Sequence, residues 1–201
     1  MVAGFHLIWT AYGWWLPNDP RGSSSHEIRI EKIAELGDLH HGRKSIQPPG
    51  REIKRFYEHA IDVLKHPLLI LEDEDIDLVA ESFGAVIKDR RYTCYACAIM
   101  PDHIHVLIRK HTDHAETMID NLQQASRAKL RDARRRSSTN PVWGGPGWKV
   151  FIYSQADFLR AIEYIRQNPI KAGRPPQIWK FVKEYDGWMP GRYISRQEIC
   201  N

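Results

Sequence analysis

Hydrophobic and polar positions along this chain repeat with the period of a helix in three places. Between residues 73 and 90, apolar side chains recur every three or four positions, with acidic residues first and basic residues last. This period and this order of charges are typical of an amphipathic helix with one buried face. A similar pattern covers about 115–135, and a third helix is predicted to begin after the capping-box sequence of residues 154–157.

Four shorter runs are rich in β-branched and aromatic residues and predict strands. They lie at residues 5–12, 92–100, 103–110 and 148–154. Only Pro101 and Asp102 separate the second run from the third, so we expect these two strands to be antiparallel neighbours. The order β-α-β-β-α-β, with a helix at the end, predicts an α+β, ferredoxin-like fold: a split-βαβ, RRM-like antiparallel sheet with helices on one face.

Two parts of the chain depart from this pattern. Residues 17–56 mix proline, glycine, serine and charged residues, a composition too polar for core elements, so we expect an insertion, a long loop or a partly ordered arm. The 201 residues are interpreted as a single domain, with that loop or insertion at about 17–70 and a C-terminal extension from about 175. A loop motif of unassigned role lies around the start of the polar segment 17–56. It consists of Trp14, Trp15, Asp19, Arg21 and Gly22.

Composition limits the class of function. Charged residues make up 27% of the chain, and a net charge of +4 with a pI near 9.0 is compatible with a polyanionic partner. No apolar run approaches the roughly 18 residues of a membrane span, and no cleavable leader is evident. We therefore expect a cytoplasmic protein without membrane contact.

The three cysteines, Cys94, Cys97 and Cys200, do not suit the disulfide framework of a small secreted protein. Cys94 and Cys97 have the spacing of a zinc-binding pair, but they lie in a predicted strand. Alternation there would place the two thiols on opposite faces, and no second pair supplies further ligands. We interpret them as core or strand cysteines.

Two pairs of residues have the chemistry of a catalytic site. His103 and His105 are two apart on a predicted strand, so both imidazoles point to one face and can hold one metal ion. Tyr164 and Asn168 are four apart on the last predicted helix, beside an apolar stripe, and share one face. A phenol has a pKa near 10 and is a poor nucleophile unless a metal ion makes the attacked phosphorus more electrophilic. A histidine pair, a hydroxyl and an amide ligand are therefore the parts of a phosphoryl-transfer site.

Each of these residues also has an ordinary interpretation. The histidines are equally at home on the polar face of a strand, and Tyr164 at the edge of an amphipathic helix. Asn168 precedes Pro169, which is expected to end the helix or nearly so, and is then a terminal amide. Gln167 carries the same amide chemistry as Asn168 but lies about 100° further around the helix.

Longer motifs favour the catalytic interpretation. The block MPDHIHVLI of residues 100–108, followed by YIRQNPIKAG of residues 164–173, resembles the HUH single-tyrosine transposases, in particular the REP-associated tyrosine transposase branch of the IS200/IS605 group. The segments FHLIWTAYGWWLP and VWGGPGWKVFIYSQADFLRAIEY are similar to the same family. One departure is Asp102, where the family pattern has asparagine. It either orients an imidazole or is a turn residue after Pro101.

The resemblance implies a metal-dependent endonuclease and strand transferase that acts on single-stranded DNA hairpins with unpaired flanks. Tyr164 would be the nucleophile and would form a 5′-phosphotyrosine intermediate. His103, His105 and Asn168 would bind Mg²⁺ or Mn²⁺, and the protein would be a monomer or homodimer. Two alternatives remain: a domesticated hairpin-binding protein of the same fold without transposition activity, and a hydrolytic metalloenzyme on a small phosphate ester.

Basic and aromatic residues after the second histidine suggest a path for DNA, because cations neutralise phosphates and exposed rings stack on unpaired bases. The alternative is a solvated helix face and a core tryptophan. The candidate DNA-binding residues are Arg127, Lys129, Arg134, Arg135, Arg136, Trp148 and Lys149.

Overall fold

The centre of the molecule is a four-stranded antiparallel sheet with the order β2-β3-β1-β4. The computed structural model describes residues 1–191 except 24, 43, 134 and 138. The strands are β1 (Gly4–Thr10), β2 (Cys94–Ile99), β3 (His103–Arg109) and β4 (Trp148–Ile152). Two interleaved split-βαβ units produce this order, so the predicted α+β, ferredoxin-like class is confirmed.

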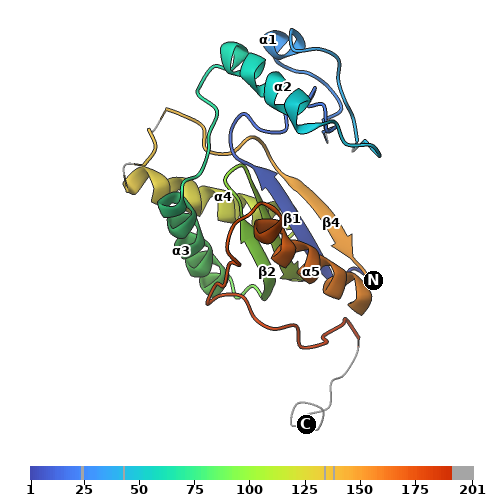
Figure 1. Cartoon of the computed structure of the whole chain (residues 1–201). Helices are drawn as coiled ribbons and strands as arrows, with labels where there is room; N and C mark the ends of the chain where they lie inside the picture. The colour runs from blue at the N-terminus through green and yellow to red at the C-terminus, as the bar shows by residue number, and fades with distance from the viewer. Residues whose placement is uncertain (24, 43, 134, 138, 192–201) are drawn as a thin grey trace.

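Helices cover the two faces of the sheet unequally (Figure 1). α3 (Asp73–Asp89) connects β1 to β2, α4 (Ala115–Asp132) connects β3 to β4, and the two pack side by side on one face. α5 (Gln155–Lys171) follows β4 and packs mainly over β2 and β3 on the other face. On the α5 side of the sheet, β1 and β4 are therefore largely uncovered.

Alternation along the strands explains the two faces. Phe5, Leu7 and Trp9 of β1 join the core under α3 and α4, together with Ile104 and Val106 of β3. The residues between them point the other way, so the side chains that share a face with α5 include the histidines. A second core forms there from the predicted α5 stripe, whose members Phe158, Ala161, Ile162 and Ile165 are all buried.

Local sequence signals fix the ends of α5. Ser154 Oγ accepts a hydrogen bond from the backbone N–H of Asp157 at 3.1 Å, and the Asp157 carboxylate accepts one from the backbone N–H of Ser154 at 2.9 Å, which confirms the predicted capping box. Pro169 lies inside the helix, which continues to Lys171. The helix thus ends two residues beyond Pro169, close to the predicted stop, and its last turn closes through a hydrogen bond from the backbone N–H of Ala172 to Asn168 O.

The two β2 cysteines correct one prediction. The register of β2 against β3 shifts between Cys94 and Ala96, and this irregularity turns Cys94 and Cys97 toward the same core. Placement of the thiols on opposite faces was therefore wrong, while the interpretation as core cysteines was right. Burial raises the pKa of the Cys94 thiol to about 12. Cys200 lies outside the described residues.

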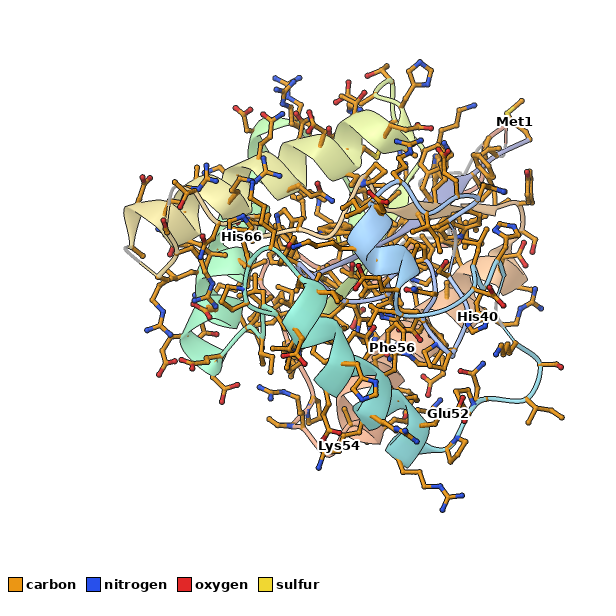
Figure 2. The ribbon with its side chains drawn as sticks, turned by 90° about the horizontal axis from the view of Figure 1, so that it is seen from above. Met1, His40, Glu52, Lys54, Phe56 and His66 are labelled. Atoms are coloured by element: carbon orange, nitrogen blue, oxygen red, sulfur yellow. The ribbon has the colours of Figure 1, made fainter. Side chains whose placement is uncertain are left out.

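The N-terminal insertion is more ordered than its composition predicts. It contains α1 (Glu31–Ala34) and α2 (Gly50–Val63), which stand above the end of the sheet in Figure 1. These form a small core of their own around Leu16, Ile33, Tyr57 and Ala60. Figure 2 looks onto this arm from above, and the labelled Glu52 and Lys54 of α2 are exposed. The prediction of a loop without core elements missed α2.

After α5 the chain continues to residue 191 without a further helix or strand among the described residues. Trp179, Phe181 and Val182 pack against the α3 side of the molecule, while Tyr185, Trp188 and Met189 pack against α5. Within residues 1–191, leaving aside the four undescribed positions, no helix combines the length and apolar character needed to cross a membrane.

Candidate active site

The histidine pair lies on β3, on the face of the sheet that α5 partly covers. The rings of His103 and His105 face the same side, with centroids 4.9 Å apart, as their spacing predicts. His105 is only 4% exposed. Burial, followed by the neighbouring His103 and His6, lowers the pKa of His105 well below its ordinary value, so the ring is neutral at neutral pH and has a lone pair available for a metal.

Both imidazoles are held through the same ring nitrogen, Nδ1. Nδ1 of His103 is 2.6 Å from Oδ1 of Asp102, and Nδ1 of His105 is 2.9 Å from Nε2 of His6. Asp102 thus has the orienting contact that was one of its two predicted roles. Burial acts to raise the pKa of Asp102, but its hydrogen bond with His103, the charge of His103 and that of Arg21 lower it overall.

His6 is a member of this cluster that the sequence analysis did not find. It lies on β1, opposite Leu107, and its ring is 5.0 Å from that of His105. Burial lowers the pKa of His6 to about 4. A single histidine in an apolar strand carries no signal of its own, and its partner is 99 residues away in the chain. Only the register of β1 against β3 reveals the contact.

Tyr164 reaches the cluster from α5. Its ring meets that of His105 edge-on at 5.4 Å between centroids and that of His6 at 6.0 Å, and the side chain remains 44% exposed. A hollow of about 270 Å³ opens beside it between β4 and α5, and its lining includes His6, Arg160 and Tyr164. The phenol therefore touches the histidines on one side and solvent on the other.

Asn168 lies one turn further along α5. Its Nδ2 donates to the backbone carbonyl of Tyr164 at 3.1 Å, whereas the Gln167 amide donates to Glu163 at 3.0 Å. Phe158, near the start of α5, packs beside Gly4, which pairs with Arg109 at one end of β3. Tyr164, further along α5, packs beside His105, so α5 runs toward the His103 end of β3. Asn168 is thus on the His103 side of Tyr164. Among the described residues, no group of three or more His, Cys, Asp or Glu side chains has the geometry of a metal site.

The loop motif at the start of the arm has a structural role. Arg21 makes two hydrogen bonds to the buried Asp19 carboxylate, at 2.9 and 2.7 Å, and its guanidinium lies 3.8 Å from the centroid of the Trp15 ring. The Tyr57 hydroxyl of α2 also donates to Asp19. Trp14 Nε1 donates to Leu69 O at 2.6 Å. These contacts join the loop to α2 and to the segment before α3, and they bring the Arg21 charge near Asp102.

The predicted DNA-binding residues divide between the two faces of the sheet. Those of the α4 region belong to the α3 and α4 face and form ion pairs: Lys129 with Glu81, Arg135 with Glu72 and Asp75, and Arg136 with Asp75. Lys149 pairs with Glu116. Arg127 is half-buried on α4, and Arg134 lies outside the described residues. Trp148, by contrast, is on the Tyr164 face.

Trp148 is 49% exposed, so the interpretation of Trp148 as a core residue was wrong. It pairs with Ile8 of β1, and Ile8 pairs with His105 of β3. The three side chains form one row across the sheet. Two strand spacings separate Trp148 from His105, roughly 10 Å.

Comparison with known proteins defines the class. The model of the family described as IS200-like transposase matches residues 52–168, more than half of the chain. The protein therefore belongs to the IS200-like transposase family. The matched segment runs from α2 to Asn168 and includes both β3 histidines and Tyr164, while β1 with His6 lies outside it.

One similar solved structure is a REP-associated tyrosine transposase bound to a REP hairpin. It superposes with a TM-score of 0.45 and 17% sequence identity, over 66% of this chain and 88% of that chain. No curated protein matches the sequence.

Proposed function

We propose that this chain is a metal-dependent single-stranded DNA endonuclease and strand transferase in which Tyr164 is the nucleophile. The observation that carries the proposal is the contact of the half-exposed Tyr164 ring with His105, 5.4 Å between centroids, on the face that also holds His103. Membership of the IS200-like transposase family supports it. A hydrolase that activates water would have no use for a phenol at this place.

The donor set fits a divalent metal ion. When both rings donate from Nδ1, His103 and His105 keep the Nε2 lone pairs for coordination, and Asn168 offers an amide oxygen. Two imidazoles and one amide leave positions for phosphate and water on Mg²⁺ or Mn²⁺, and the nitrogen ligands suit manganese well. When bound, the ion would polarise a non-bridging phosphate oxygen and so make the phosphorus more electrophilic.

The Tyr164 phenol would attack the phosphorus in line with the leaving 3′-oxygen. Its O–H proton is released, the P–O3′ bond breaks, and the departing oxygen takes up a proton to become a free 3′-hydroxyl. The product is a 5′-phosphotyrosine in which the energy of the phosphodiester is conserved, so a later 3′-hydroxyl can reverse the step without ATP. Exposure of Tyr164 gives the strand access to the phenol.

The substrate strand is proposed to run over the open half of the sheet. Trp148 would stack on an unpaired base next to the attacked phosphate, because it lies in one row with Ile8 and His105. Arg160 beside the hollow is a further cation on this side. The remaining candidates, Arg127, Lys129, Arg134, Arg135, Arg136 and Lys149, stay predicted DNA contacts for other parts of the hairpin.

The sequence resemblance to the REP-associated branch supports the further proposal that the protein acts on REP-like hairpins with unpaired flanks, in the cytoplasm and as a monomer or homodimer. The REP-associated transposase of known structure was bound to a REP hairpin. A transposase of a mobile element and a domesticated host enzyme would share this chemistry.

The test is covalent trapping. Wild-type protein incubated with a labelled hairpin and Mn²⁺ should give a species that survives denaturant, with DNA attached to the peptide containing Tyr164. Tyr164→Phe keeps the ring and removes the nucleophilic oxygen, so it should bind hairpins and form no adduct. An adduct on Tyr12 or Tyr153, or hairpin binding without an adduct in the wild type, would refute the proposal.

A further inference from the structure

His6 is a polar residue that the proposed chemistry does not yet use. It is buried in β1 and faces α5, in contact with the rings of both His105 and Tyr164. Burial of an imidazole costs free energy unless its nitrogens are hydrogen-bonded. An apolar residue would fill this strand position with less penalty, so the contact between His6 Nε2 and His105 Nδ1, 2.9 Å, calls for an explanation.

The contact is informative because each neutral imidazole carries only one N–H. If His105 donates from Nδ1, it keeps a lone pair on Nε2, and His6 accepts with its Nε2. If His6 donates instead, the proton of His105 sits on Nε2 and blocks coordination there. Only the first arrangement is compatible with a metal at His105 Nε2.

The neighbouring histidine has the same arrangement with a different partner. Asp102 is a carboxylate that can only accept, so His103 donates from Nδ1 and presents Nε2. Contacts of this kind fix the ring orientation and the tautomer of metal-binding histidines. On β1 the sequence provides no carboxylate opposite His105, and the acceptor is the lone pair of His6.

We infer that His6 is a positioning residue, which holds the His105 imidazole in the Nδ1–H tautomer and aims its Nε2 at the metal. The inference rests on the proposed function in one respect, that His105 is a metal ligand. It assigns no contact between His6 and the metal itself.

The first test observes the tautomer directly in the full-length, metal-free protein. Long-range ¹⁵N–¹H correlation spectra at pH 7.5 distinguish a protonated Nδ1 from a protonated Nε2. His105 should appear as the Nδ1–H tautomer in the wild type and as a mixture in His6→Ala. A wild-type His105 protonated on Nε2, or the same pure Nδ1–H tautomer in His6→Ala, would overturn the inference.

The second test measures the affinity for Mn²⁺ alone by calorimetry. His6→Gln places an amide oxygen near the position of the imidazole Nε2 and can accept the same hydrogen bond, whereas His6→Asn has the same amide but falls short. We expect Gln to stay within a few-fold of the wild type, and Asn and Ala to lose about 10- to 100-fold. Equal affinity of all four proteins would refute the inference, and so would a loss in Gln as large as that in Ala.

Matched controls separate the alternatives. His59 is an exposed histidine of α2, and His59→Ala should bind Mn²⁺ as the wild type does. The Gln and Asn variants differ by one methylene, so the comparison survives even if His6→Ala does not fold. Both tests omit DNA. A protein that never cleaves a hairpin but shows these tautomer and affinity differences would refute the proposed function and leave the inference standing.

Discussion

The two faces of the sheet differ in how completely they are covered. Under α3 and α4, side chains such as Leu7, Phe83 and Ile104 are fully buried, and cations at the helix ends are paired with carboxylates such as Asp75. On the other face α5 packs mainly over β2 and β3, and the candidate site residues lie where this cover ends. The larger of the two cores and the candidate site thereby lie on opposite sides of the same strands.

This division has a physical reason. The proposed nucleophile Tyr164 must be reached by a bulky DNA strand and cannot be enclosed, whereas burial keeps the proposed metal-binding imidazoles neutral. Where α5 stops covering the sheet, buried imidazoles and an exposed phenol can lie next to each other. Substitutions on the two faces should therefore change different observables.

The largest effect is expected from His105→Ala or His103→Ala. Loss of a metal that stabilises transition-state charge removes several kcal/mol, about 10³-fold in cleavage rate. Hairpin cleavage with Mn²⁺ should fall by at least that factor, and wild-type protein in EDTA should match the variants. Circular dichroism should show that the fold persists. Cleavage at the wild-type rate in EDTA would contradict the metal assignment.

The next effect belongs to the opposite face. Phe83→Ala empties a fully buried position of α3 and should lower the free energy of unfolding by about 3 to 5 kcal/mol, measured with urea. At a temperature where the variant is folded, its Mn²⁺ affinity should equal that of the wild type, because the histidines lie beyond the sheet. A parallel loss of metal affinity would show that the two faces are coupled.

The limits of sequence-based prediction follow the same distinction between local and distant contacts. The capping box at Ser154 and the α5 stripe are local patterns, and the structure has them as predicted. So is the pair His103 and His105. The partner of His105, in contrast, is His6, and the shared orientation of Cys94 and Cys97 depends on an irregularity in strand pairing. Neither leaves a trace in the spacing of residues.

The missed helix α2 is a different case, because its signal was present. Ile53, Phe56, Tyr57 and Ala60 recur at helical spacing across the end of the polar segment 17–56. Average composition over residues 17–56 concealed this period, since residues 17–50 are rich in serine, glycine and proline. A shorter window would have indicated the helix.

Acid should destabilise the protein through His6 on the half-covered face. His6 has a lowered pKa of about 4 in the folded protein against 6.5 unfolded, so the unfolded chain takes up the proton first and stability is lost as pH falls from 6.5 toward 4. At pH 5 the loss is about 2 kcal/mol. Urea unfolding of metal-free protein at pH 7.5 and 5.0 should show it in the wild type. Between these pH values, the free energy of unfolding of His6→Gln should fall by about 2 kcal/mol less than that of the wild type. An equal fall in both proteins would contradict the assignment to His6.

The smallest effect concerns the open half of the sheet. Trp148→Ala removes an exposed ring, so the free energy of unfolding should change by less than about 0.5 kcal/mol. Affinity for a hairpin with unpaired flanks should fall about 10-fold, within the ~1 to 3 kcal/mol of one stacked base.

Tyr153→Ala is the matched control. Its ring is 56% exposed and lies against Phe151, which packs on Phe5 toward the opposite face. Fluorescence anisotropy at physiological salt should show no loss for Tyr153→Ala, and equal losses in both variants would mean that the strand does not distinguish the two faces.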